Sequence, residues 1–236
     1  MADPTRDLFE YVVRLLEPVL EHLVFVGGCA TGMLISDPAA AGIRSTNEVE
    51  AIADITSYAM YSALANRLRT IGLKQDAGNG AAARRWRLDN AIVDIVPSDR
   101  SVLGFSNTWY GPAIASAQRT TMAGGQVRLV APACFVATKL EAFHIRGRGD
   151  VIASSDLEDI VMVVDGRPQL LDEIARADQQ VRQFIAAEIS ALVDNRRFAD
   201  SLAGFLPPDR ASQARRPLLE KRLNAIAAWQ RPGSAP

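Results

Sequence analysis

The chain has 236 residues, enough for one large domain or two small ones. Hydrophobic residues make up 48% of it, so we expect a substantial core and exclude global disorder. The net charge is −1, from 26 basic and 27 acidic residues, which excludes a general polyanion binder. Any contact with nucleic acid would therefore have to come from a local basic patch. The two cysteines, Cys29 and Cys134, fit neither a disulfide framework nor a zinc spacing. With no signal-like N-terminus and no long apolar run, we expect a cytoplasmic protein that does not enter a membrane.

The first half of the chain mixes helical and strand patterns. In chain order, hydrophobic periodicity predicts a helix over 6–20, a strand over 22–26, a helix over 29–35, a strand over 48–54 and a helix over 57–73. Strands over 84–88 and 91–97 are then expected to form a hairpin. The stretch 98–126 is expected to be mostly loop with short strands, and a further strand is predicted over 126–130. Ser57 is the expected N-cap of its helix, and Asp89-Asn90 is the expected hairpin turn.

The second half is predicted to be helical. Pro132 is expected in the first turn of a helix, and helical periodicity recurs over 133–145, 155–164, 169–177, 181–193 and 214–229. A strand-rich half followed by a helical half indicates the α+β class, with a mixed sheet, flanking helices and a helical C-terminal region. We place the division at 1–130 and 131–236, and expect the helical part to complete the active site.

A glycine pair, Gly27-Gly28, directly follows the first predicted strand and precedes a helix. Glycines there let a ligand approach the backbone and expose amide groups that suit phosphate, and Thr31 can add a hydroxyl. The spacing matches neither a Walker loop nor a dinucleotide fingerprint. The alternative is a tight strand-to-helix turn without a ligand.

Three carboxylates stand out on predicted strands. Glu48 and Glu50 are two residues apart and therefore share one face of a strand, while Asp94 is the single charge in the apolar run "AIVDIV". If the two strands are neighbours, the three acids converge and can hold Mg²⁺ (or Mn²⁺), with nucleotide phosphates completing the coordination. The alternative is a salt-bridged strand face with a separate strand-edge acid.

These segments carry a resemblance. "FVGGCATGMLISDPAAAGIRSTNEVEAI" and "RRWRLDNAIVDIVPSD" resemble the nucleotidyltransferase fold, and more closely the AbiEii/AbiGii toxin family of type IV toxin–antitoxin nucleotidyltransferases. Members of that family have a glycine pair, an Arg-x-Thr-x-Asp-x-Asp segment and a third acid on a later strand. Gly27 and Gly28 match the glycine pair, Arg44 and Thr46 the basic and hydroxyl positions, and Asp94 the third acid.

The resemblance continues in "ATKLEAFHIRGRGDVIASSDLEDIVMVVDGR" and covers roughly residues 22 to 167. Lys139 and Arg146 match the lysine and arginine of a family helix, and Asp156 and Asp159 match the aspartates of the next one. Helical spacing puts Lys139 and Arg146 on one face, where they can neutralise a triphosphate.

Structural alternatives exist for these charged segments as well. "SDLEDI" also fits a capping box in which Ser155 caps the helix and Glu158 reaches back. The arginines of "RRWRL" (84–88) fit a solvated strand edge as well as a local patch for RNA.

The resemblance implies an enzyme that moves a nucleoside monophosphate from an NTP to an acceptor such as tRNA, as a toxin controlled by an antitoxin. The metal ligands would then be Glu48, Glu50 and Asp94, the nucleotide-binding residues Gly27, Gly28, Thr31, Arg44, Thr46, Lys139 and Arg146, and the acceptor-orienting acid Asp156 or Asp159. A protein hydroxyl or a small molecule stays open as the acceptor.

The chain departs from the family pattern at Glu48-Val49-Glu50, where the family has Asp-Val-Asp. The charge is kept, but each carboxylate stands one methylene further from the backbone, and Mg²⁺ demands near-ideal octahedral geometry. Three explanations stay open: an adapted site, a relative that binds nucleotide or a partner without transferring anything, and an engineered replacement that weakens activity.

Overall fold

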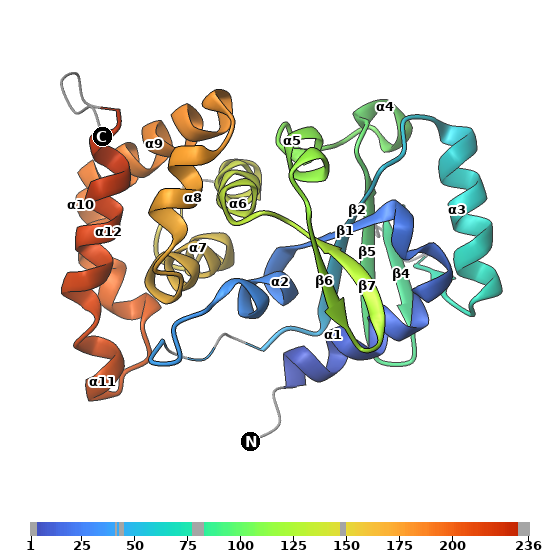
Figure 1. Cartoon of the computed structure of the whole chain (residues 1–236), viewed down its shortest axis with the longest axis horizontal. Coiled ribbons are helices and arrows are strands. Elements are labelled where there is room, and N and C mark those ends of the chain that lie inside the picture. The colour runs from blue at the N-terminus through green and yellow to red at the C-terminus, as the bar shows by residue number, and fades with distance from the viewer. Residues whose placement is uncertain (1–3, 41, 43–44, 77–82, 147–149, 231–236) are drawn as a thin grey trace. The chain divides into compact units, whose positions relative to one another are not determined.

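The computed structural model describes residues 4–40, 42, 45–76, 83–146 and 150–230 (Figure 1). The chain divides into two compact units, which we describe separately. The sheet unit comprises Met1–Gly32 and Arg44–Ala131, and the helical unit comprises Met33–Ile43 and Pro132–Pro236. Within those described ranges no helix combines the length and apolar character needed to cross a bilayer.

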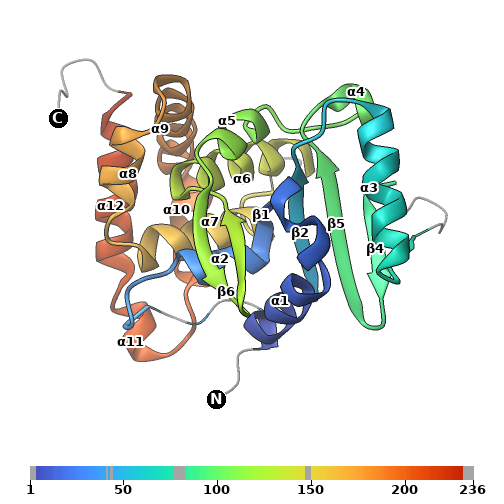
Figure 2. The same cartoon turned by 45° about the vertical axis from the view of Figure 1, so that its right-hand side comes forward.

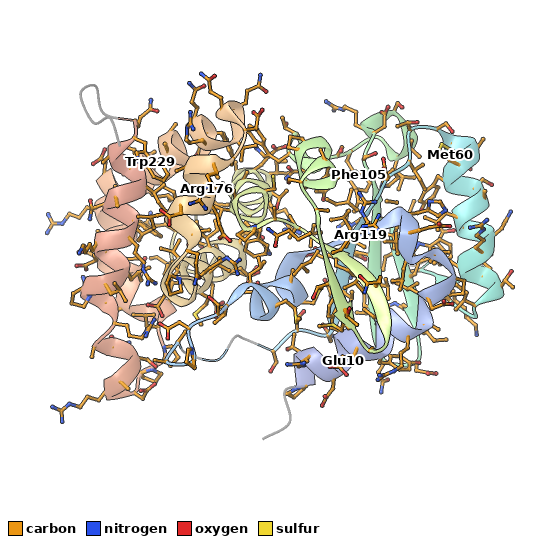
Figure 3. The ribbon with its side chains drawn as sticks, in the orientation of Figure 1. Glu10, Met60, Phe105, Arg119, Arg176 and Trp229 are labelled. Atoms are coloured by element: carbon orange, nitrogen blue, oxygen red, sulfur yellow. The ribbon has the colours of Figure 1, made fainter. Side chains whose placement is uncertain are left out.

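The sheet unit is built on a seven-stranded mixed sheet in the order β3-β4-β5-β2-β1-β7-β6 (Figure 2). Strand β2 lies at its centre, antiparallel to β1 and parallel to β5, while β1 also runs parallel to β7. The strands are β1 (Leu23–Val26), β2 (Glu48–Ala53), β3 (Lys74–Gln75), β4 (Arg85–Leu88), β5 (Ala91–Pro97), β6 (Gln118–Met122) and β7 (Gly125–Leu129). A mixed sheet followed by helices confirms the expected α+β class.

Two helices of the sheet unit pack against the same face of the sheet. The Phe9 ring of α1 meets the Phe25 ring of β1 edge-on at 4.9 Å, and the Arg69 guanidinium of α3 lies 5.6 Å from the centre of the Trp86 ring on β4. The helical elements of this unit are α1 (Pro4–Leu15), η1 (Glu17–His22), α2 (Gly27–Leu34, which crosses into the helical unit), α3 (Tyr58–Thr70), α4 (Arg100–Leu103) and α5 (Tyr110–Ala115).

The pleat of the central strand then decides where its acids point. Val49 pairs with Val93 and Ala51 with Ile95, and all four side chains are buried on the face that α1 and α3 cover. Because successive residues of a strand alternate between faces, the even-numbered residues of β2 point to the opposite face. Glu50 is one of them, so the carboxylates lie on the side of the sheet away from these two helices.

The helical unit is an assembly of helices around an apolar core. Helix α12 packs along α9 and α7, and α6 packs against α7 and α9, as Figure 1 also shows. The elements are α6 (Pro132–Arg146), α7 (Ser155–Gly166), α8 (Leu170–Arg176), α9 (Gln179–Asp194), α10 (Arg196–Ser201), η2 (Leu202–Phe205), α11 (Arg210–Gln213) and α12 (Arg216–Ala228). Segment 33–43 is grouped with these helices, although it precedes β2 in the chain.

Several local expectations are confirmed. The Ser57 side chain accepts a hydrogen bond from the Met60 N–H and caps α3, as predicted. Helix α6 begins at Pro132, whose missing N–H costs nothing in a first turn. The hairpin β4–β5 turns at Asp89, which has the positive φ of 50° that such a turn requires. Both cysteines are buried thiols.

Two local predictions and one of the alternatives are wrong. The helix expected over 6–20 ends at Leu15 and is followed by a 3-10 turn, because Pro18 cannot donate the hydrogen bond that would continue it. The stretch 98–126, expected to be mostly loop, contains two short helices in addition to β6. Helix α7 is capped by Ser154, not Ser155, since the Ser154 hydroxyl accepts from the Leu157 N–H.

Candidate functional site

Two of the predicted metal ligands are direct neighbours in the sheet. Glu50 on β2 is in register with Asp94 on β5, and on the other side of β2 it is in register with Val26, the last residue of β1. Asp94 is in turn in register with Arg85 on β4. The row Arg85–Asp94–Glu50–Val26 therefore crosses four strands, with its side chains on one face. Glu48 lies two residues before Glu50 and shares that face.

The glycine pair begins where this row ends. Gly27 directly follows Val26 and has a φ of +73°, a left-handed conformation that favours glycine. A Cβ placed on Gly27 would lie 1.7 Å from Oε2 of Glu50, so the Glu50 carboxylate occupies the space that glycine leaves open. Gly28 comes next, in the first turn of α2. The predicted glycine pair and the predicted acids thus form one cluster.

Arg85 connects two of the acids. Its Nε donates to Asp94 Oδ1 at 2.9 Å and its Nη2 donates to Asp94 Oδ2 at 3.0 Å, a two-pronged arrangement. The same Nη2 lies 3.0 Å from Glu48 Oε1. The Nε of Arg84 adds a longer contact to Asp94 Oδ2 at 3.3 Å. The arginines of "RRWRL" are therefore not all on a solvated edge, because two of them neutralise a buried carboxylate.

The charge balance of this cluster follows from burial. Asp94 is only 2% exposed, and a buried carboxylate is costly unless cations and donors satisfy it. The hydrogen bond to Asp94 raises the pKa of Arg85 above its usual value, against the opposing effect of burial. Arg85 is consequently charged at every accessible pH, and it is held to Asp94 by a charge-assisted fork.

The donors of this cluster suit a divalent cation chemically, since carboxylate oxygens are the ligands that Mg²⁺ prefers. Within the described part of the chain, however, no three acidic, histidine or cysteine side chains are grouped so that they could hold a metal ion. Both Asp94 oxygens instead accept hydrogen bonds from guanidinium groups. Metal binding by Glu48, Glu50 and Asp94 stays a prediction.

The remaining predicted nucleotide-binding residues of the sheet unit differ in their surroundings. Thr46 hydrogen-bonds through its hydroxyl to the main chain of Glu48, so it fixes the start of β2. Thr31 is buried, and its hydroxyl has no hydrogen-bond partner among the residues that the structure describes. Arg44 lies outside the described residues.

A second charged cluster lies within the helical unit and contains the predicted residues of the later motif. Lys139 Nζ on α6 is 3.1 Å from Asp156 Oδ1 and 2.6 Å from Asp159 Oδ2, both on α7. Arg146, two turns further along α6, donates to Asp156 Oδ1 at 2.9 Å. The predicted common face of Lys139 and Arg146 is thus confirmed, because both contact Asp156. Lys139, Asp156 and Asp159 are all buried.

A third charged cluster was not predicted from the sequence. Asp165, fully buried at the end of α7, accepts from Arg215 Nε at 2.7 Å. Arg215 Nη2 also donates to Asp37 Oδ2 at 2.7 Å, and Arg222 donates to the Asp165 carbonyl. These partners are far apart in sequence, so no local pattern marks them. They anchor segment 33–43 to the helical unit.

Comparisons with known proteins bear on the fold. No family model and no curated protein sequence matches the chain. Among solved structures, the chain is similar to an antigenic nucleotidyltransferase-like protein from Paracoccidioides brasiliensis, with a TM-score of 0.51, 19% identity, and coverage of 86% of this chain and 93% of that one. It also aligns with JHP933 from Helicobacter pylori, with a TM-score of 0.46, 11% identity, and coverage of 95% and 90%. The first likeness establishes a nucleotidyltransferase-like fold.

Proposed function

We propose that the protein is a metal-dependent nucleotidyltransferase that transfers a nucleoside monophosphate from an NTP to an acceptor hydroxyl. The observation that carries this proposal is the register of Glu50 beside Asp94, with the Glu50 carboxylate against Gly27. Carboxylates on adjacent strands next to a glycine turn offer the oxygen ligands and backbone amides that suit a metal–triphosphate complex. The nucleotidyltransferase-like fold supports the same conclusion.

In this reaction the acceptor oxygen attacks the α-phosphorus of the NTP. The bond between the α-phosphorus and the bridging oxygen breaks, pyrophosphate leaves with the electron pair, and the acceptor proton passes to a carboxylate. We assign the metal ligands to Glu48, Glu50 and Asp94; a bound Mg²⁺ would supply charge neutralisation for the triphosphate. The backbone amides that follow Gly27 suit phosphate oxygens.

The buried cluster of the helical unit has a separate role in the proposal. We assign to Lys139 and Arg146 the positive charge that stabilises the leaving pyrophosphate. Asp156 or Asp159 would orient the acceptor hydroxyl and receive its proton.

The acceptor and the partner are inferred from the resemblance to the AbiEii/AbiGii toxin family. It makes tRNA the first acceptor to test and an antitoxin the first protein partner. The second candidate function is a nucleotide-binding or partner-binding module that transfers nothing. Two features favour it: glutamates stand where the family has aspartates, and Arg85 engages both Glu48 and Asp94.

A transfer assay separates the two functions. The protein is incubated with Mg²⁺, total RNA and each NTP in turn, labelled at the α-phosphate, beside Glu50→Gln and the control Asp54→Asn. Asp54 is an exposed acid just beyond β2, so its replacement changes the same charge outside the site. Label in tRNA that is lost only in Glu50→Gln supports the transferase. If no label is transferred, NTP binding measured by calorimetry supports the silent nucleotide-binding module. If NTP is neither transferred nor bound, the transferase and the nucleotide-binding module are both contradicted.

A further inference from the structure

Arg85 holds an unusual position for a strand arginine. Three of its contacts go to two of the carboxylates assigned to the metal: two to Asp94 and one to Glu48, all between 2.9 and 3.0 Å. A forked pair of hydrogen bonds to one carboxylate is the geometry in which arginine binds most strongly and most specifically. The guanidinium therefore occupies the oxygens that a divalent cation would need.

A neighbouring arginine shows that this arrangement is specific to Arg85. Arg87 lies two residues further along β4, on the same face, and pairs with Asp76 at 2.8 Å. Its side chain is 49% exposed, against 25% for Arg85. The Arg87 pair is thus a surface ion pair of little energetic weight. The Arg85 contacts, by contrast, involve Asp94, which is almost fully buried.

The forked guanidinium lies where a cation bound to both Asp94 oxygens would sit, and it uses lone pairs that such a cation would need. A guanidinium and a divalent cation held against the same carboxylates also repel each other. Glutamate at position 48 favours the guanidinium further, because its longer side chain reaches across to Arg85 on the far side of β5.

We propose that the Arg85 guanidinium and a divalent cation compete for the same oxygens of Asp94 and Glu48, so that metal enters only when Arg85 leaves. This inference rests on the proposed function, which assigns these acids to the metal. An NTP offers phosphate oxygens to the released guanidinium. Metal and NTP binding therefore promote each other, and by linkage each raises the affinity for the other by the same factor.

The direct test measures Mn²⁺ binding without any nucleotide. Free Mn²⁺ is followed by electron paramagnetic resonance during titration of the full chain, of Arg85→Gln and of the matched control Arg87→Gln. Losing one charge-assisted contact corresponds to about a tenfold change or more in affinity, so Arg85→Gln is expected to bind Mn²⁺ at least about tenfold more tightly than the unaltered chain. Arg87→Gln is expected to bind like the unaltered chain. Equal or weaker binding in Arg85→Gln, or no Mn²⁺ binding in any form, overturns the inference.

A second measurement covers the case in which Arg85→Gln does not fold, since Asp94 would lose a buried partner. The arginine Nε–H signal of Arg85 in the unaltered chain is followed by NMR while Mg²⁺ is added. We expect it to move and to lose its protection from solvent exchange, and an unchanged, protected signal at saturating Mg²⁺ overturns the inference.

The same experiments distinguish a failure of this inference from a failure of the proposed function. Competition at Arg85 without nucleotide transfer supports the inference and contradicts the transferase function. Nucleotide transfer without competition at Arg85 supports the transferase function and contradicts the inference.

Discussion

Gly27→Ala tests the contact between the glycine turn and Glu50. The new Cβ would lie 1.7 Å from Oε2, 2.6 Å from Cδ and 2.9 Å from Cβ of Glu50. A rotation of the glutamate side chain can remove the first two clashes. It cannot remove the third, because the Glu50 Cβ is fixed by the strand backbone, so β2 or the start of α2 must also shift.

The size of the effect has two parts. An alanine at a φ of +73° costs about 1–2 kcal/mol relative to glycine. Overpacking against Glu50 adds about 1–3 kcal/mol. The free energy of unfolding should thus fall by about 2–5 kcal/mol, which for a chain of this size lowers the melting temperature by roughly 4–20 °C.

The control is Gly104→Ala, because Gly104 has a φ of +80° but no heavy atom within 4 Å of an added Cβ. It carries the backbone cost without the clash. Thermal unfolding followed by circular dichroism compares the two variants and the double variant Gly27→Ala/Glu50→Ala, which should recover part of the loss. If Gly27→Ala is no more destabilised than Gly104→Ala, the reasoning about Glu50 is refuted.

Two further predictions concern the helical unit. Lys139→Met leaves Asp156 and Asp159 without the ammonium group that both contact. Removing one partner of such a buried cluster should lower the free energy of unfolding, measured by urea titration, by about 3–5 kcal/mol. An unchanged urea midpoint would contradict the role of these ion pairs in stability. The hydrogen bond from Arg215 holds the pKa of Asp37 below its ordinary value, so its stabilisation is present above about pH 4 and is lost as the pH falls through the lowered pKa. Asp37→Asn should therefore lower the melting temperature at pH 7 and lower it by progressively less as the pH falls below about 4, and a loss that stays the same across this range would count against this assignment.

The elements with strong local signals could be predicted from the sequence. Ser57 and Pro132 mark helix starts because capping and a missing N–H act within one turn. The break at Pro18 was overlooked, because the apolar periodicity runs on past it. The short helices within 98–126 span too few residues to show any periodicity.

The candidate site was only partly foreseeable. The sequence offers convergence of Glu50 and Asp94 only on the condition that their strands are neighbours, and the assembled sheet meets that condition and fixes their register. The contact between Arg85 and Asp94 could have been found, since a two-residue turn that pairs Leu88 with Ala91 also pairs Arg85 with Asp94.

The cluster of Asp165, Arg215 and Asp37 could not have been found in this way. Its members come from three distant segments, and only the tertiary packing of the helical unit brings them together.

The proposed function requires Glu48, Glu50 and Asp94 to bind nucleotide through a divalent cation. Isothermal titration calorimetry with each NTP tests this requirement, first with Mg²⁺ and then with EDTA in place of Mg²⁺. The proteins compared are the unaltered chain, Glu48→Gln/Glu50→Gln and Glu48→Asp/Glu50→Asp. We predict binding that requires Mg²⁺, disappears in the double glutamine variant and persists in the double aspartate variant. Binding that is equal with EDTA, or equal in the double glutamine variant, would contradict the claim.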